Sequence, residues 1–147
     1  MARDVLLDTG PIVATLDRND HWHARCAAAW QTILDRCVTT EAVVTEACHL
    51  VQRGGAAAAL PLDFLLAAQI PILGLETGLH RHAASLMSRY ADAPMDYADA
   101  TLVALGDALD IGSVMTTDRR GFGAYRRSRG GAFRLLPGPQ PAPTRGR

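Results

Sequence analysis

The 147-residue sequence predicts an α/β protein: a three-layer α/β/α sandwich with a mostly parallel central sheet. Short apolar runs bounded by turn residues alternate along the chain with longer segments that have apolar residues at helical spacing. The first run, residues 5–7, is continuously apolar, as expected of a strand buried on both faces of a parallel sheet. With 48% hydrophobic and 20% charged residues, the composition is that of one ordinary globular domain.

The first half of the chain contains two predicted strands and the helices that follow them. The first strand covers residues 3–7, and Pro11 suits the first turn of the next helix. Residues 21–36 have apolar side chains at helical spacing, and residues 37–39 form the second strand. Thr40 is the predicted N-cap of a helix over residues 41–53, which Gly54 and Gly55 end.

The second half continues the alternation. Residues 56–69 are rich in Ala and Leu and are predicted to be helical, with Pro61 near a break, and residues 71–75 form the third strand. Helices over residues 77–90 and 96–109 precede a fourth strand, 113–117, and an edge strand, 133–136. The domain therefore covers residues 1–136. The Pro-, Gly- and Arg-rich residues 137–147 are predicted to be a disordered tail.

The distribution of charge and cysteine excludes several classes of protein. All 15 basic residues are arginines, which excludes a P-loop lysine, a Schiff-base lysine and a lysine general base. From Arg119 onward there is no acidic residue, so the chain has a basic C-terminal part and an acidic remainder. No apolar run has the length of a membrane span, and we expect no signal peptide. Three cysteines without a CxxC motif predict free thiols in a reducing cytoplasm.

Four carboxylates lie among apolar or small residues at places where catalysis could use them. Asp8 ends the first strand and Asp118 follows the fourth, and parallel strands bring such ends to the same edge of a sheet. Glu46 lies one to two turns into the 41–53 helix, and Asp99 lies in the first turn of the 96–109 helix. Each also has an ordinary explanation: a helix cap, a favourable charge in a first helical turn, or a solvated side chain.

A cluster of four carboxylates requires a cation. Two such charges 4 Å apart repel by roughly 4 kcal/mol at an effective dielectric constant of about 20. Oxygen ligands select Mg²⁺ or Mn²⁺, and Mg²⁺ tends to keep waters and to share phosphate oxygens of a substrate. Such an ion activates water and stabilises displacement at a phosphodiester. The residues alone therefore predict a metal-dependent α/β hydrolase.

Four segments of the chain, in order, resemble the four motifs of the PIN domain. They are Leu6-Leu7-Asp8-Thr9-Gly10-Pro11, Thr45-Glu46, Asp96-Tyr97-Ala98-Asp99-Ala100 and Thr116-Thr117-Asp118-Arg119-Arg120-Gly121-Phe122. The resemblance covers about residues 5–136, and a short PIN domain of this kind is similar to the toxin of a bacterial VapBC toxin–antitoxin pair. It implies a cytoplasmic, Mg²⁺- or Mn²⁺-dependent endoribonuclease that acts on single-stranded RNA, forms a homodimer and is inhibited by a small antitoxin protein.

The resemblance also implies roles for individual residues. The family's catalytic and metal-binding quartet maps onto Asp8, Glu46, Asp99 and Asp118. Asp96 matches an acid of some relatives and ranks as a secondary metal ligand, while Thr9 and Thr117 would support the site. Arg120 stands where many members have another acid, which would weaken a second metal position and let Arg120 contact phosphate.

Three points remain open at the level of the sequence. A phosphate-binding rim and a solvated or antitoxin-docking strip both explain Arg119, Arg120, Arg126, Arg127 and Arg129. Dimer or antitoxin contacts could use the early helices or the apolar residues within 60–66. Two other functions are a phosphoacceptor receiver domain, which normally needs a lysine, and a non-catalytic PIN-fold protein that only binds partners. The histidines show no catalytic or metal-binding spacing.

Overall fold

The computed structural model describes residues 2–139, which form one five-stranded sheet with the strand order β3-β2-β1-β4-β5. Every neighbouring pair of these strands is parallel, which confirms the predicted sheet. The strands are β1 (Val5–Leu7), β2 (Cys37–Thr40), β3 (Ile72–Leu73), β4 (Ser113–Met115) and β5 (Arg134–Leu136).

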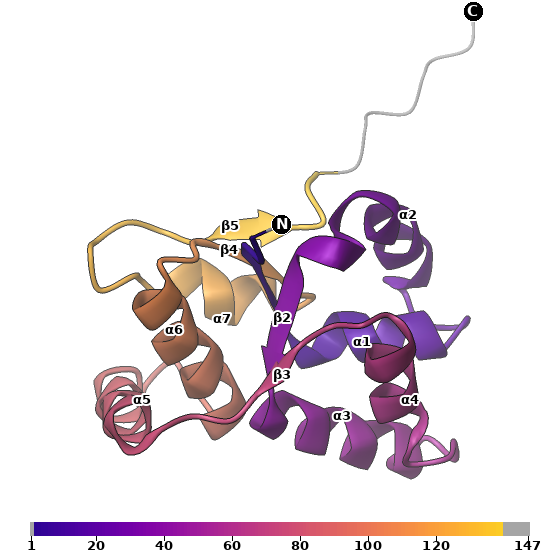
Figure 1. Ribbon diagram of the computed structural model, residues 1–147, viewed down its shortest axis with the longest axis horizontal. Coiled ribbons are helices and arrows are strands. Elements are labelled where there is room, and N and C mark those ends of the chain that lie inside the picture. Colours follow the sequence, from indigo (N-terminus) through magenta and orange to yellow (C-terminus); the bar gives the residue numbers. More distant parts are fainter. Residues whose placement is uncertain (1, 140–147) are drawn as a thin grey trace, which may run out of the picture.

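Helices cover both faces of the sheet, as the three-layer prediction requires. The helices are α1 (Thr9–Leu16), α2 (His23–Ile33), α3 (Glu41–Arg53), α4 (Leu60–Ala67), α5 (Thr77–Arg89), α6 (Tyr97–Leu109) and α7 (Arg119–Ala124), with a 3-10 turn at Leu34–Arg36. In Figure 1, α1 to α4 lie to one side of the sheet and α5 and α6 lie to the other. In the part of the chain described, no helix is long and apolar enough to cross a membrane.

The centre of the core is β1, whose three residues are fully buried. The strand lies between β2 and β4, and apolar residues of α6, among them Leu102 and Val103, are also fully buried. Burial on both faces explains why β1 is continuously apolar rather than alternating. The same position places the residue that follows β1 in the middle of the carboxyl edge of the sheet.

Some predicted boundaries were wrong, for local reasons. The helix predicted over residues 56–69 begins only at Leu60, because Gly55 has a positive φ of 88° and turns the chain. Pro61 lies in the first turn of α4 rather than at a break. The N–H groups of a first turn have no acceptor within the helix, so the N–H that proline lacks is not missed there. The six residues of α7 were not predicted because Gly121 and Gly123 give them a weak helical pattern.

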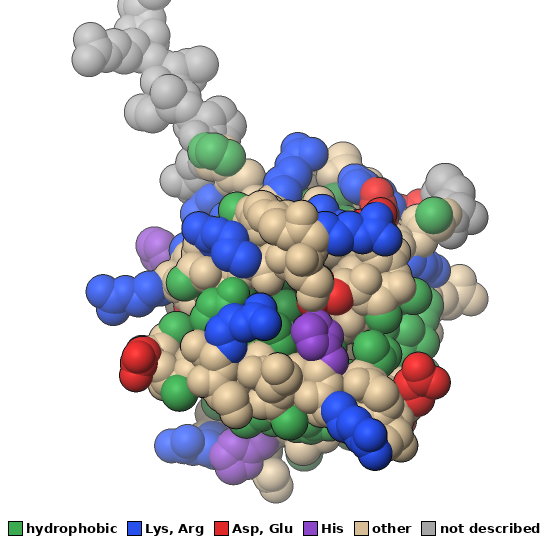
Figure 2. All heavy atoms as spheres, turned by 90° about the vertical axis from the view of Figure 1, so that its left-hand side faces the viewer, with side chains coloured by type: hydrophobic (Ala, Val, Ile, Leu, Met, Phe, Trp, Pro, Cys, Tyr) green, Lys and Arg blue, Asp and Glu red, His purple; other side chains and the backbone are tan. Residues whose placement is uncertain are grey.

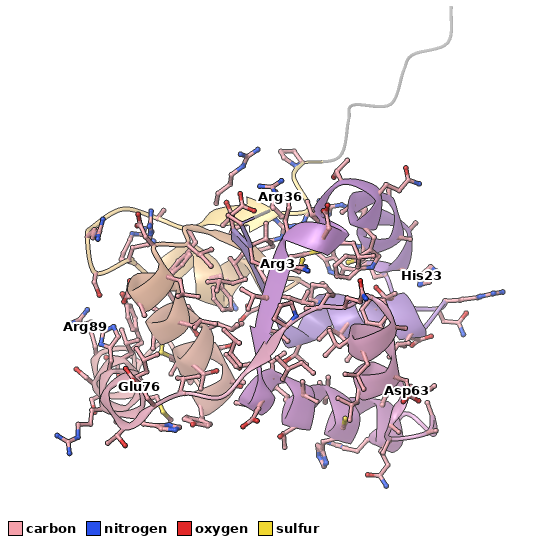
Figure 3. All side chains as sticks on the ribbon, viewed as in Figure 1. Arg3, His23, Arg36, Asp63, Glu76 and Arg89 are labelled. Carbon is pink, nitrogen blue, oxygen red and sulfur yellow. The ribbon has the colours of Figure 1, made fainter. Side chains whose placement is uncertain are left out.

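Charges at the amino edge of the sheet are paired. The Arg36 guanidinium donates to both Asp4 carboxylate oxygens, at 2.8 and 2.9 Å. Arg3 donates to the carbonyl oxygens of Cys37 and Gln69, and Figure 3 shows Arg3 and Arg36 at this end of the fold. Residues 3 and 4, predicted to begin the first strand, therefore lie outside β1, and their side chains bind at this edge of the sheet. At the opposite edge of the sheet, the carboxyl edge, the acidic side chains have no such ion pair among residues 2–139.

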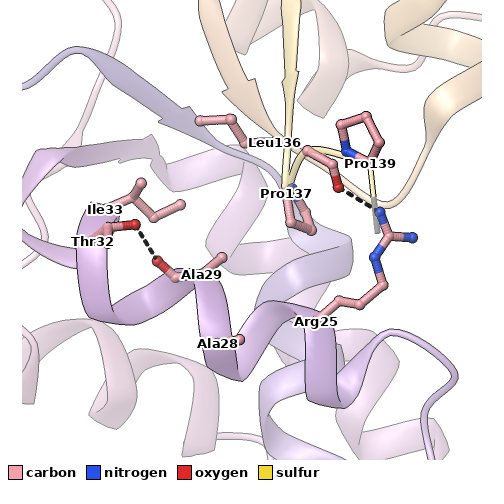
Figure 4. Close-up of a pocket in the computed structure, with 9 residues that line it drawn as sticks. Arg25, Ala28, Ala29, Thr32, Ile33, Leu136, Pro137 and Pro139 are labelled. Atoms are coloured by element: carbon pink, nitrogen blue, oxygen red, sulfur yellow. Dashed lines mark hydrogen bonds between the residues drawn. The ribbon is translucent and has the colours of Figure 1, made fainter. Parts of the chain in front are cut away.

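Two arginines hold the backbone that follows β5, an arrangement that we call the clasp. Arg25 donates to the carbonyl oxygen of Gly138 at 2.8 Å, and Arg119 donates to that of Pro137. The two guanidinium carbons lie 4.2 and 4.9 Å from the centre of the Trp22 ring. Figure 4 shows how residues 136–139 border a groove beside α2. Residues 137–139 of the predicted tail are thus in contact with the domain, and residues 140–147 lie outside the described residues.

Candidate functional site

The buried carboxylate at the carboxyl edge of the sheet is Asp8. Its side chain is only 5% exposed and accepts a hydrogen bond from the Thr116 hydroxyl at 2.7 Å. The backbone N–H of Asp118 donates to the same hydroxyl at 2.9 Å, so Thr116 connects the two strand ends. Although Asp8 precedes α1, its carboxylate makes no capping hydrogen bond among the described residues. Helix capping therefore does not explain Asp8.

Asp96 and Asp118, in contrast, do cap helices. One oxygen of Asp96 accepts from the Asp99 N–H at 2.8 Å, and one oxygen of Asp118 accepts from the Gly121 N–H at 2.9 Å. Each cap fixes the carboxylate through a single oxygen. Both side chains are exposed, so the ordinary explanation holds for these two acids and still leaves an oxygen of each for a ligand.

The other two carboxylates come from helices on opposite sides of the sheet. Asp99, in the first turn of α6, accepts a hydrogen bond at 2.9 Å from the hydroxyl of the buried Tyr125. Glu46, on α3, is half-buried close to Thr9. Thr9 Oγ1 is itself buried and has no hydrogen-bond partner among the described residues. Thr9 Oγ1 is thus a buried polar atom beside Glu46 that has no hydrogen bond of ordinary geometry within the described chain.

The electrostatics show that these acids form one cluster. Burial, and then the neighbouring carboxylates Asp118 and Asp96, raise the pKa of Asp8 to about 6. Burial raises the pKa of Asp99 to about 8, with Asp8 and Asp96 adding to the shift. Burial, and then mainly Asp96, raises that of Glu46 to about 7. The fold thus brings together the acids predicted from the sequence, and their mutual repulsion is not relieved.

No cation neutralises the cluster within residues 2–139. The ion pairs there join Arg36 to Asp4, His82 to Asp107, and Arg127 and Arg129 to Asp110. In the same residues, no three Asp, Glu, His or Cys side chains are arranged so that they could hold a metal ion by themselves. The all-oxygen donor set and its uncompensated charge fit a hard cation that keeps waters and shares substrate oxygens, rather than one enclosed by protein.

Two cavities border the cluster. One, of about 450 Å³, is lined by Glu46, His49, Asp96 and Tyr97 among others. The other, of about 540 Å³, is lined by Asp118, Arg120 and Tyr125 together with residues 92–94. Because acids of the cluster line both, an extended ligand could cross the carboxylates with parts in each cavity.

Comparison with known families agrees with this geometry. The model of the PIN domain family matches residues 5–127. The chain belongs to the PIN domain family. This confirms the family predicted from the four motifs.

Individual proteins resemble this chain over three quarters or more of its length. Ribonuclease VapC26 of Mycobacterium tuberculosis is 30% identical over 135 residues, which are 90% of this chain and 100% of that protein. Crystal structures with the same fold include Mycobacterium tuberculosis VapC20, a sarcin–ricin loop cleaving toxin, with a TM-score of 0.68, 20% identity and coverage of 75% of this chain and 86% of that one. Another is PAE2754 from Pyrobaculum aerophilum, with a TM-score of 0.54, 15% identity and coverage of 84% and 86%.

The arginines that follow the fourth PIN motif differ in their surroundings. Arg119 is half-buried in the clasp, and burial lowers the pKa of its guanidinium. Arg120 is exposed beside Asp118. The Arg126 guanidinium donates to the carbonyl oxygens of Gly123 and Tyr125, whereas Arg127 pairs with Asp110. In Figure 2, arginines are spread over the face formed by α5 and the loop after α7, among apolar side chains.

Several contacts of this PIN domain were not predicted from the sequence. Thr116 and Tyr125 hold Asp8 and Asp99, and neither was a predicted site residue. Histidines without a partner in the sequence have one in the fold. His82 lies 2.7 Å from Asp107, which also accepts from Ser128, and His80 bonds to Tyr97. The sequence did contain a signal for Thr116, because it adjoins Thr117 at the end of the strand. It contained none for Tyr125 or for the histidine contacts.

The close approach of α1 to the fourth motif depends on Gly10. A Cβ atom at this position would lie 1.9 Å from Thr117 Oγ1, so Gly10→Ala must displace Thr117. We expect this variant to lose ~1–3 kcal/mol of stability through overpacking, or about 2–4 °C of melting temperature per kcal/mol. The measurement is thermal unfolding by circular dichroism.

The matched control is Gly78→Ala in α5, where nothing lies within 4 Å of the added Cβ atom. Since alanine is the better helix former, the control should melt at the same temperature as the wild type or higher. Equal stability of both variants would contradict the close approach at Gly10.

Proposed function

We propose that the chain is a Mg²⁺- or Mn²⁺-dependent endoribonuclease that hydrolyses phosphodiester bonds in single-stranded regions of RNA. The observation that carries the proposal is the unneutralised carboxylate cluster around Asp8 at the carboxyl edge of a PIN-domain sheet. The 30% identity to Ribonuclease VapC26 supports an activity on RNA. We also propose that it is the toxin of a type II toxin–antitoxin pair, in line with its similarity to VapC proteins.

In this proposal, the cation is held by oxygens of the cluster: Asp8, Glu46, Asp99 and Asp118, with Asp96 as a secondary ligand. Such an ion, when bound, supplies an activated water and positive charge at the phosphate. The remaining residues position the carboxylates. Thr116 orients Asp8, the Tyr125 hydroxyl orients Asp99, and the Gly121 N–H fixes one oxygen of Asp118. Gly10 lets Thr117 approach α1 and so supports the same loop.

Arg120 is the best candidate for a contact to the RNA backbone. It is exposed and lines a cavity together with Asp118, and a guanidinium matches two phosphate oxygens. Arg119 has its guanidinium engaged in the clasp and Arg126 has its own on backbone carbonyls. Their proposed role in RNA binding is therefore weaker than that of Arg120.

The proposed partners are an antitoxin protein and a second copy of the chain in the cytoplasm. Exposed leucines on neighbouring helices support an apolar contact surface: Leu50, on α3, and Leu60, Leu62 and Leu66, on α4. Apolar patches of this kind mark interfaces in soluble proteins.

The test is cleavage of an end-labelled RNA by the purified full chain. We expect cutting with Mn²⁺ or Mg²⁺, none with a chelator, and none when the same sequence is held in a duplex. Arg120→Ala should raise KM more than it lowers kcat. If no RNA is cut and calorimetry detects no Mn²⁺ binding, the chain is instead a non-catalytic PIN-fold protein that binds partners.

A further inference from the structure

The cavity beside Glu46 has an aromatic wall, formed by Tyr97. Tyr97 is 44% exposed, whereas all other Phe, Trp and Tyr side chains in the described residues are buried or half-buried. It is the first residue of α6 and directly follows Asp96 of the cluster. Tyr97 lines the same cavity as Glu46 and Asp96, so its exposed ring is available to a ligand bound beside the acids.

The Tyr97 ring is held in one orientation. Its hydroxyl is hydrogen-bonded to His80 Nδ1 at 2.9 Å, and the two rings are stacked at 12° with their centres 6.2 Å apart. The ring borders two cavities, one that contains His80 and one that contains Glu46 and His49. A ring fixed by a neighbour on another helix is a ready-made surface for stacking, because little side-chain entropy is lost when a ligand binds.

The chemistry of the cavity selects a base rather than a phosphate. Glu46 and Asp96 line it, and their carboxylates accept hydrogen bonds from the amino and imino groups of bases, whereas no arginine of the described residues lines it that could pair with a phosphate. The cavity that contains Arg120 borders the cluster at Asp118 and suits the sugar–phosphate backbone. Only an unpaired base has a free face, since bases in a helix are stacked on one another.

We propose that Tyr97 is the stacking surface for an unpaired nucleobase of the RNA, next to the phosphate at the carboxylate cluster. The inference rests on the proposed ribonuclease function and specifies how the single strand is held. His49 and Glu46 line the same cavity and face the edge of the bound base. Tyr97 is thus a substrate-positioning residue, and it explains why duplex RNA would be a poor substrate.

The test is equilibrium binding of short single-stranded RNAs, in which one position at a time is abasic, followed by fluorescence anisotropy. All proteins carry Asp8→Asn to slow hydrolysis, and Mn²⁺ is present. We expect one position at which removal of the base weakens binding by about 5- to 150-fold, which corresponds to ~1–3 kcal/mol of base–aromatic stacking. Tyr97→Leu should weaken binding of the intact RNA by a similar factor. For this variant, removing the base at that position should cause no further loss of affinity.

Two further variants separate stacking from other effects. Tyr97→Phe keeps the ring and should bind within about 3-fold of its parent. Leu109→Ala, at the other end of α6 and 51% exposed in the parent, is the matched control and should not change binding. Should Tyr97→Leu fail to fold, Tyr97→Trp gives a second measurement. Stacking of a base on the new indole quenches its fluorescence, and the parent protein, which contains only Trp22 and Trp30, gives the background to subtract.

The outcomes are distinct for the two proposals. Equal binding by Tyr97→Leu, or an unquenched Tyr97→Trp, overturns the stacking site even if the wild type cleaves RNA. If the Asp8→Asn parent binds with the expected abasic pattern but the wild type never cleaves, the ribonuclease is overturned and the base site stands. Absence of any RNA binding overturns both.

Discussion

Asp8→Asn should reduce metal-dependent RNA cleavage by ~10²- to 10³-fold, because a lost metal ligand removes several kcal/mol of transition-state stabilisation. Asp8 is the most buried acid of the cluster, and its carboxylate makes no capping bond that could give it a structural role. Asparagine keeps the shape and still accepts from Thr116, so the fold should persist. Initial rates at saturating Mn²⁺ give the comparison.

The control for this variant is Asp63→Asn, the same chemical change at an exposed residue of α4 (labelled in Figure 3), a helix that contributes no acid to the cluster. It should cleave at the wild-type rate. A wild-type rate for Asp8→Asn would mean that Asp8 is not a functional carboxylate, and the assignment of the whole cluster would then fail.

Metal-free protein should become less stable as the pH rises from about 5 to 8.5. The carboxyls of Asp8, Glu46 and Asp99 ionise near pH 4 when unfolded, but with pKa values of about 6, 7 and 8 in the fold, mainly through burial. The folded state therefore binds more protons in this range, so the free energy of unfolding falls with rising pH. We expect a loss of ~2 kcal/mol, or about 4–8 °C in melting temperature.

Asp99→Asn isolates the largest of these shifts. The variant should approach the stability of the wild type only as the pH falls to about 4 and below, where Asp99 is protonated in the folded and the unfolded chain, and should be more stable at pH 8.5. Adding Mn²⁺ at pH 8.5 should stabilise the wild type, since the ion binds the folded state. A flat pH dependence of the wild-type melting temperature between pH 5 and 8.5 would contradict the repulsion inferred for the cluster.

Part of the site could be predicted because its signals are local. Asp8 and Asp118 each follow an apolar strand, and parallel topology brings strand ends to one edge. The role of each individual acid at this edge of the sheet could not be predicted. Capping and clustering look alike in the sequence, yet Asp96 and Asp118 cap helices while Asp8 does not. The backbone angles of Asp8 (φ −85°, ψ 170°) and Asp96 (φ −85°, ψ 176°) are nearly the same, so the difference lies in the side chain, which at Asp8 accepts from Thr116 instead.

The contacts that were missed join residues that are distant in the chain. Thr116 lies 108 residues from Asp8, and Tyr125 lies 26 residues from Asp99, directly after a helix too short and glycine-rich to be predicted. Arg119 and Arg120 are neighbours with the same side chain, but successive helical residues point in different directions, so one enters the clasp and the other faces Asp118. The spacing of residues in the sequence does not indicate which of the two arginines enters the clasp.

The clasp has a consequence for which substitutions this chain can accept during evolution. Arg25 and Arg119 bind the carbonyl oxygens of residues 138 and 137, which every amino acid possesses. Nothing lies within 4 Å of a Cβ atom added at Gly138. Natural selection can therefore conserve the two arginines while the residue at position 138 drifts freely. Among homologues, conservation should thus be found in the donors of this contact and be absent from that acceptor residue.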